Sequence, residues 1–197
     1  MSRTTLTAAA IALSMTVFAP GSALAQSPRV ERAFVSGGTV DLELAAGEYT
    51  ISASPDDRIR VQWQTNRPED MDNVDVDVDI KGSHARIQTD GPLRDGMTVR
   101  IELPRRTHIV ARLSAGELRL SGIEGSKDVE ARAGELTIAT GGPQHYRRVD
   151  ASVRIGELSA TPFKVDTGGF FRSFTWSGTG QYELQAHLTV GELRLTP

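Results

Sequence analysis

Cysteine is absent from this 197-residue sequence, which excludes disulfide bonds, thiolate metal sites and a cysteine nucleophile. Aromatic residues are also scarce, at 6% of the chain. The formal charge is only −3, and binding to nucleic acid calls for a strongly basic surface instead. We therefore predict no nucleic-acid partner, and a fold that depends on its apolar core for stability.

Long apolar runs are missing beyond the first 25 residues, and these residues have the pattern of a secretory signal peptide. Arg3 supplies the positive end, residues 6–18 are mostly apolar, and Ala23-Leu24-Ala25 is a small-x-small cleavage site. Nothing later approaches the roughly 20 apolar residues that a membrane helix needs. The sequence therefore predicts export to the periplasm or the extracellular medium, with no membrane span after signal removal.

The rest of the chain has the pattern of β-strands. Val, Ile, Leu and Thr alternate with charged residues, and Gly or Pro interrupts the pattern at short intervals. Residues 73–80, NVDVDVDI, show the alternation most clearly, with Val and Ile on one face and Asp on the other. We predict one all-β domain over residues 26–197, with an N-terminal β part (26–105) and regular repeats (106–197).

The repeats are marked by Gly-Glu-Leu, which occurs four times, and AAGEYTISA at Gly47 is a fifth, variant copy. The apolar positions lie five, three and one residues before each glycine and two and four residues after it. The four glycines are Gly116, Gly134, Gly156 and Gly191. A continuous strand cannot change the parity of its buried face, because its side chains strictly alternate. Gly-Glu-Leu is therefore predicted to be a bend between two strands that share one interior.

The spacing of these glycines predicts a β-solenoid, or β-helix-like repeat domain, in which stacked rungs share a core. Gly116, Gly134 and Gly156 are separated by 18 and 22 residues, whereas Gly191 follows after 35, which indicates an insertion over residues 161–181. An antiparallel β-sandwich with Gly-Glu at its hairpin corners is the alternative, since it also has short strands at regular spacing.

The repeats, together with IELPRRTHIVARLSAGELRLSGIEGSKDVEARAGELTI and GTGQYELQAHLTVGELRLTP, resemble an uncharacterised bacterial putative-adhesin family with β-strand repeats. That family is related to the putative auto-transporter adhesin head domain. The resemblance covers roughly residues 30–197 and implies an exported β-solenoid-like domain. It implies no catalytic residues.

The repeated glutamates raise the question of a metal. In-register rungs would place Glu48, Glu117, Glu135, Glu157 and Glu192 in a row, about 4.8 Å apart. Such a row could bind calcium, but one acid per corner is sparse for that ion. We expect instead a solvated row, shielded by nearby arginines or bound to corner amides. The arginines are Arg112, Arg119, Arg132, Arg154 and Arg194.

Other polar residues give weaker signals. Asp75, Asp77 and Asp79 begin like a calcium loop, but Ile80 stands where that loop needs glycine, so a strand is predicted. The four histidines, which are His84, His108, His145 and His187, show no zinc-like spacing. A basic patch could form from two groups, Arg105, Arg106 and His108 with Arg147 and Arg148, although solvated side chains are the simpler interpretation. No cofactor or metal site is predicted.

The insertion holds the unusual residues. Phe170, Phe171, Phe174 and Trp176 lie close together in a chain with few aromatics. They could form an exposed platform for a glycan or protein partner, or a cap over the end of the core. Phe170, Phe174 and Trp176 share strand parity, which favours the cap.

These features predict an exported, non-enzymatic module of the cell envelope with an adhesin-like or structural role. Its partner would be an envelope protein or a glycan, and the oligomeric state is left open. The alternative is a carbohydrate-active enzyme, which requires two carboxylates at a defined separation. Acids that repeat at every corner are poorly suited to such a unique site.

Overall fold

Thirteen strands and three short 3-10 helices make up the regular structure in the computed structural model, which describes residues 27–91 and 96–197. The predicted signal peptide, residues 1–25, lies outside the described residues. The strands are β1 (Arg29–Ala33), β2 (Thr39–Leu44), β3 (Gly47–Ser54), β4 (Arg58–Thr65), β5 (Asp75–Lys81), β6 (His84–Asp90), β7 (Met97–Pro104), β8 (His108–Leu113), β9 (Gly116–Ser121), β10 (Lys127–Ala139), β11 (Tyr146–Ala160), β12 (Val165–Ser177) and β13 (Tyr182–Thr196). The helices are η1 (Pro68–Asn73), η2 (Pro143–His145) and η3 (Thr161–Phe163).

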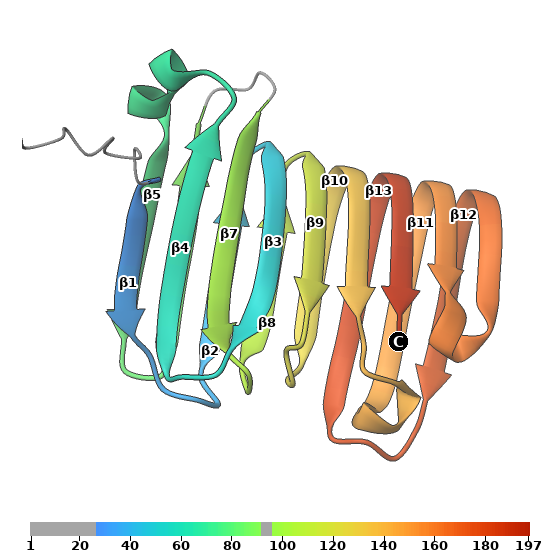
Figure 1. Cartoon of the computed structure of the whole chain (residues 1–197). Helices are drawn as coiled ribbons and strands as arrows, with labels where there is room; N and C mark the ends of the chain where they lie inside the picture. The colour runs from blue at the N-terminus through green and yellow to red at the C-terminus, as the bar shows by residue number, and fades with distance from the viewer. Residues whose placement is uncertain (1–26, 92–95) are drawn as a thin grey trace, which may run out of the picture.

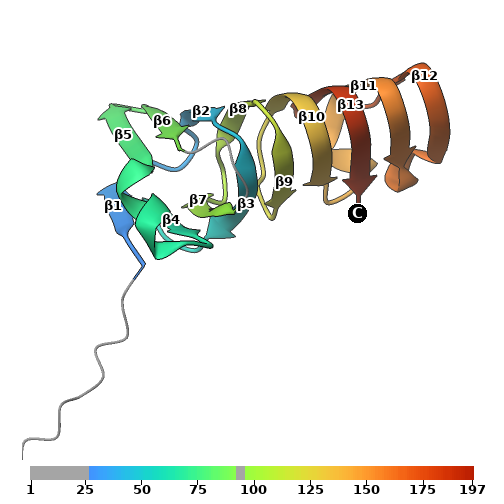
Figure 2. The same cartoon turned by 90° about the horizontal axis from the view of Figure 1, so that it is seen from above.

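The described strands form one mixed sheet that curves back on itself, so that two limbs face each other across the core (Figures 1 and 2). One limb contains β1, β4, β7, β3 and β9, and the other contains β5, β6, β2 and β8. The long strands β10, β13 and β11 bend and contribute to both limbs. The all-β prediction is confirmed, and the shape is that of a nearly closed, barrel-like sheet.

Each Gly-Glu-Leu glycine lies where a strand passes from one limb to the other. Gly116, Gly134, Gly191 and Gly156 have φ values of 114°, 125°, 134° and 137°, a region that side chains other than hydrogen rarely allow. Gly47 pairs in the same row beside Gly116, as the variant repeat predicts, but it does not share the positive φ. A Cβ atom on Gly134 would overlap the carbonyl oxygen of Gly116 on the neighbouring strand. The glycines therefore allow both the bend and the close stacking of the strands.

The bend is wider than the parity argument predicts. Ile155 and Val190, one residue before their glycines, are 42% and 43% exposed, whereas the sequence predicts them to be buried. In each Gly-Glu-Leu repeat the residues from two before the glycine to one after it are exposed or partly exposed, so the strand turns over this whole span. Burial resumes at the leucine two residues after each glycine, as at Leu136 and Leu193.

The core consists of apolar side chains that repeat in register on neighbouring strands. Tyr49, Leu118, Leu136, Leu193 and Leu158 form one such row, and all five are at most 1% exposed. Burial of a leucine side chain contributes about 2 kcal/mol. The repeat therefore stabilises the fold by placing equivalent leucines in contact between strands.

The order of the strands in space differs from their order along the chain. β13 lies between β10 and β11 and pairs in parallel with both (Figure 1). The predicted insertion forms η3, β12 and a connection, and β12 pairs antiparallel with β11 at the edge of the sheet. Because the chain runs out to this edge and back, its last strand fills the gap between two earlier ones. The chain therefore does not form a simple stack in which each rung lies next to the one before it in the sequence.

Candidate functional site

A groove of about 700 Å³ crosses the outer face of β8, β10, β13, β11 and β12, just before their bends. Its volume falls in the range of small-molecule sites. Its lining comes from residues two to four positions before the repeat glycines, and from Phe171, Arg172 and Ser173 of β12. The in-register pairing that aligns the repeat therefore also aligns the groove.

The groove is strongly cationic. Four arginines line it and Glu130 is its one acid, although the whole chain is acidic. Arg112 binds Asp128 through two contacts of 3.1 Å, and its Nε lies 3.3 Å from Glu130. The Asp128 carboxylate raises the pKa of Arg112 above its ordinary value. The carboxylates of Asp128 and Glu130 therefore offset the charge of Arg112 at one end of the groove.

The other three arginines carry positive charge that no acid balances. Arg132, Arg154 and Arg172 are exposed, and none forms an ion pair with any residue in the described part of the chain. Arg172 donates from Nε to the carbonyl of Gly168 at 2.7 Å, which holds its guanidinium beside the groove. The groove thus presents three separate guanidinium groups to solvent.

Polar uncharged side chains lie between these arginines. The hydroxyl of Ser152 and Nδ1 of His187 form a hydrogen bond of 2.8 Å across β11 and β13. Ser173 and Thr189 also line the groove. Hydroxyl and imidazole groups can both donate and accept hydrogen bonds. The floor can therefore bind a hydroxyl-rich ligand between the positive charges.

The four predicted aromatics separate into two groups. Phe174 and Trp176 are half-buried and pack on Phe163 of η3, with ring centroids 5.7 and 5.3 Å apart. Phe170 and Phe171 are 68% and 76% exposed. Phe171 lines the groove and has a φ of 53°, which is unusual for an aromatic residue. The aromatic set thus contributes both to the core and to the surface.

The parity argument for Phe170 is wrong. Phe170 pairs with Ile155, the exposed residue at the bend of β11, and it follows the bend toward solvent. Phe174 and Trp176 pair with Ala151 and Val149, both fully buried, before that bend. Strand parity holds only on one side of the corner, so three aromatics of equal parity do not share one face.

The repeat glutamates form the predicted row, in the spatial order Glu48, Glu117, Glu135, Glu192 and Glu157. Arg194 lies 2.5 Å from Glu192 and also contacts Glu135, and Arg119 contacts Glu117. These two of the five proposed arginines shield the row. Arg112, Arg132 and Arg154 face the groove on the other side of the bend instead.

The remaining predicted residues do not converge. Asp75, Asp77 and Asp79 are exposed on β5, as the strand interpretation predicts. His84 lies 3.1 Å from Asp41, Nδ1 of His108 accepts the Ser126 amide, and His145 belongs to η2. Residues 27–91 and 96–197 contain no group of three His, Asp or Glu side chains arranged to hold a metal ion.

The two basic groups of the sequence do not form a joint patch. Arg105 pairs with Glu124 at 3.3 Å, and Arg147 pairs with Glu183 at 2.9 Å. Arg148 lies 3.6 Å from Asp150. Nearby acids therefore balance these arginines, and the charge excess lies in the groove instead.

A second, smaller cavity of about 290 Å³ contains a buried lysine. Lys127 is 2% exposed, and its ammonium donates to the Gly125 carbonyl at 3.1 Å and to the Tyr146 hydroxyl at 2.9 Å. Burial lowers the pKa of Lys127 to about 8, against the opposing influence of Glu124. The same burial raises the pKa of Tyr146. The lysine ties β10 to β11 at the end of the core away from the bends.

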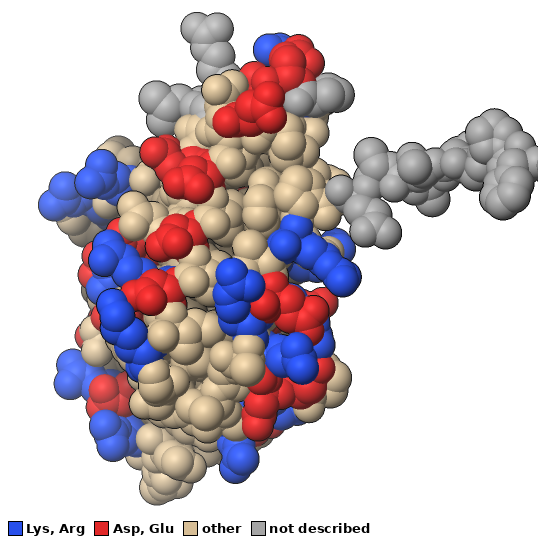
Figure 3. All heavy atoms as spheres, turned by 90° about the vertical axis from the view of Figure 1, so that its left-hand side faces the viewer, with Lys and Arg blue, Asp and Glu red and all other residues tan. Residues whose placement is uncertain are grey.

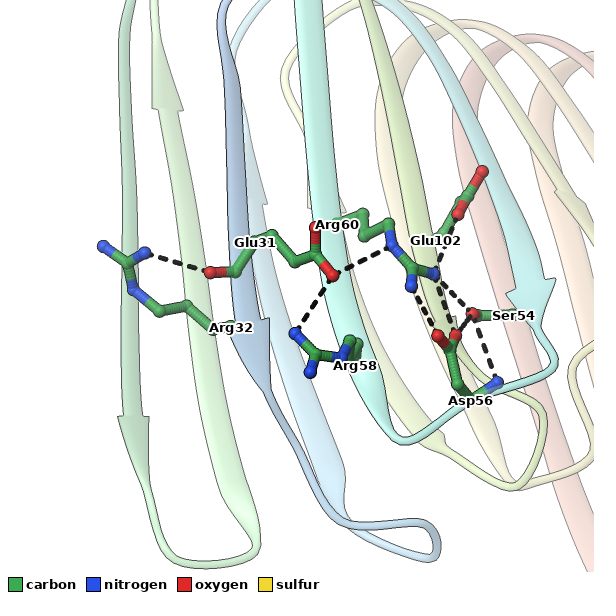
Figure 4. A network of polar contacts seen from close by, with 7 residues as sticks. All are labelled: Glu31, Arg32, Ser54, Asp56, Arg58, Arg60 and Glu102. Carbon is green, nitrogen blue, oxygen red and sulfur yellow. Dashed lines mark hydrogen bonds and ion pairs between the residues drawn. The ribbon is translucent and has the colours of Figure 1, made fainter.

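The densest network of charges lies on the opposite part of the molecule, around Arg60 of β4 (Figure 4). Its guanidinium contacts Glu31 at 3.3 Å, Asp56 at 2.5 Å and Glu102 at 3.4 Å. The hydrogen bonds from Arg60 and Ser54 lower the pKa of Asp56. The network joins β1, β4 and β7 to a turn, and positive and negative groups alternate over this end (Figure 3). We assign it a structural role.

The sequence did not lead us to predict the groove, although the repeated position of two of its arginines was visible there. Arg132 and Arg154 both lie two residues before a repeat glycine, but the register of β12 against β11, with Arg172 opposite Val153, was needed to place Arg172 in the same groove. Arg172 has no counterpart in the repeats. The antiparallel pairing of β12 with β11 is what completes the site.

Comparison with known proteins supports the fold. No protein-family model matches the sequence, and no curated protein does. The structure is similar to a putative cell adhesion protein from Clostridium sporogenes, with a TM-score of 0.51 and 14% identity over 87% of this chain and 99% of that one. A putative adhesin from Bacteroides fragilis has a TM-score of 0.30 at 10% identity, covering 87% and 97%. The likeness to the Clostridium sporogenes protein confirms the resemblance at the level of the fold.

Proposed function

We propose that this protein is an exported, adhesin-like binding domain of the cell envelope, and that it binds a surface polysaccharide in the groove over β10, β13, β11 and β12. The observation that carries this proposal is the groove itself, with its unpaired arginines, its hydroxyl-bearing floor and the exposed ring of Phe171. Concave sites that combine a few polar groups with an aromatic wall are typical of ligand binding.

The proposal includes export and a β-solenoid-like repeat. The signal-peptide pattern of residues 1–25 supports export to the periplasm or the cell surface. The in-register parallel pairing of β10, β13 and β11 supports a solenoid-like stack. The printed names of the similar structures, putative cell adhesion protein and putative adhesin, fit an interaction role. None of the described helices is long and apolar enough to cross a membrane.

The domain acts by binding and not by catalysis in this proposal. Hydrolysis of a polysaccharide requires two carboxyl groups on either side of the scissile bond. Glu130 is the one acid that lines the groove, and the guanidinium of Arg112 already holds it. Release of reducing ends from a bound polysaccharide, in proportion to time, would contradict this part of the proposal.

A pair of neighbouring phenylalanines provides the test. Phe171→Asn removes the ring from the groove wall, and Asn tolerates the left-handed backbone that Phe171 adopts. Phe170→Ser removes a ring outside the groove that is also mostly exposed. We expect retention on immobilised bacterial surface polysaccharides to weaken about fivefold for Phe171→Asn, because stacking on an aromatic ring contributes on the order of 1 kcal/mol.

The Phe170→Ser variant should be retained on the polysaccharides as strongly as the original chain. The proposal is wrong if none of the polysaccharides retains the original chain, or if both variants lose retention equally. Thermal unfolding of each variant provides the control for folding.

A further inference from the structure

We propose that the ligand of the groove is an acidic saccharide, a chain whose sugar rings carry carboxylate groups. This inference rests on the proposed function and adds the chemical class of the polysaccharide. Its basis is the position of the three arginines that lack an acidic partner in the described structure.

The three arginines lie on three different strands of the sheet. Arg132 on β10 and Arg154 on β11 are separated by β13, so their backbones are roughly 10 Å apart at the usual spacing of neighbouring strands. Arg172 lies on the strand next to Arg154, opposite Val153. A single small anion would have to draw the long side chains of Arg132 and Arg154 together from two strands. A ligand that repeats its negative charge along a chain can contact both without drawing them together.

The uncharged groups of the groove discriminate between kinds of polyanion. Ser152, His187, Thr189 and Ser173 lie between and beside the arginines and offer donors and acceptors for hydroxyl groups. The ring of Phe171 supplies an apolar surface at one side. Sugars combine hydroxyl edges with an apolar face, whereas an acidic peptide has no regular array of hydroxyls. This combination favours a carboxylated saccharide.

The charges around the groove limit the direction in which the saccharide can lie across the sheet. The row of repeat glutamates lies across the bend from the arginines, on the other limb of the sheet. Its two end members, Glu48 and Glu157, form no ion pair within the described residues and would repel a polyanion that continued over the corner. At the β8 end the carboxylates of Asp128 and Glu130 offset the charge of Arg112. The saccharide is therefore expected to lie across β10, β13, β11 and β12, along the row of free arginines.

The test compares two forms of one saccharide, with free and with methyl-esterified carboxyl groups. Calorimetric titration of the purified chain with tetragalacturonate should show binding that weakens as sodium chloride increases, because salt screens exposed charges. Fully methyl-esterified tetragalacturonate has the same sugar chain without the carboxylates. We expect the ester to bind at least about tenfold more weakly, since hydrogen bonds to charged groups contribute roughly 1.5–3 kcal/mol.

Arginine variants test whether the saccharide binds in the groove. Arg132→Gln and Arg154→Gln should each weaken the binding of tetragalacturonate about tenfold or more. Arg148→Gln is the matched control, because it removes an exposed arginine from the same strand β11 outside the groove. It should leave the binding unchanged.

Each contrary result has a separate meaning. Equal binding of the acid and the ester, with loss in Phe171→Asn, would overturn the acidic ligand while the proposed polysaccharide-binding function stands. Tighter binding of hexaglutamate than of tetragalacturonate would assign the groove to acidic peptides and overturn the inference. Absence of tetragalacturonate binding would also overturn it, and the retention assay on surface polysaccharides would then decide the proposed function independently.

Discussion

Lys127 shows how a single buried charge determines a response to pH. Its folded-state pKa is about 8, below the ordinary value of 10.5, because its ammonium is removed from water. Between these two values the unfolded chain binds more protons than the folded one. The free energy of unfolding should therefore rise with pH from about 8 to about 10, by up to about 1.4 kcal/mol per pH unit.

Urea denaturation at several pH values measures this slope. Lys127→Met keeps a long, flexible side chain at the position without the titrating group, and we expect the slope to disappear in that variant. Above pH 10 the trend should reverse, because burial raises the pKa of Tyr49 to about 12. An identical slope in both proteins would show that another group titrates.

Gly134 meets two structural requirements of the bend, a positive φ and close contact with the neighbouring strand. Its φ is 125°, and a Cβ atom there would overlap the Gly116 carbonyl of β9. We expect Gly134→Ala to lower the free energy of unfolding by about 3 kcal/mol or more, measured by urea denaturation.

Gly37→Ala provides a matched control for the backbone alone. Gly37 also has a positive φ, of 86°, but a Cβ atom there would have no neighbour within 4 Å. This variant should cost about 1 kcal/mol. If the two substitutions had equal effects, close stacking of the strands would not be the reason for glycine at the bend.

At the scale of the element, β12 combines a structural face with a binding face. Phe174 and Trp176 pack with Phe163 over the end of the core, while Phe171 and Arg172 border the groove. Trp176→Ala should therefore lower the free energy of unfolding by about 2 kcal/mol, less than a fully buried tryptophan would.

Phe170→Ala is the comparison on the same strand, because its ring is mostly exposed. We expect it to change the free energy of unfolding by no more than about 0.5 kcal/mol in the same denaturation experiment. A larger loss from Phe170→Ala than from Trp176→Ala would contradict the division of the strand into two faces.

The elements themselves were largely accessible from the sequence. The alternation in NVDVDVDI appears as β5, with its aspartates exposed and its valines half-buried. The bend at Gly-Glu-Leu follows from the change in parity, because a strand cannot change its buried face without turning. The width of the bend did not follow, and Ile155, Val190 and Phe170 were misplaced for that reason.

At the scale of the whole molecule, the position of β13 decides how the second half of the chain assembles. β13 pairs with β10 on one side and with β11 on the other, so β11 and β12 reach the rest of the sheet mainly through it. We expect a chain that ends at Gln181 to lose the ordered structure of β11 and β12, while the strands up to β10 keep theirs.

Amide hydrogen exchange measures this difference strand by strand. A chain that lacks only Pro197 is the control, and its exchange should match that of the full sequence. Continued protection of β11 in the chain that ends at Gln181 would show that β11 can pair directly with β10.

The sequence by itself determined the all-β class, the repeated bend and the rows of leucine and glutamate, because side-chain alternation along a strand is a local property. Only the tertiary structure decided that β13 enters between β10 and β11, and that Arg132, Arg154 and Arg172 share one groove. Equivalent repeats offer equivalent pairing surfaces to one another. Their order in space therefore depends on how the chain returns from β12, and a local pattern does not record that.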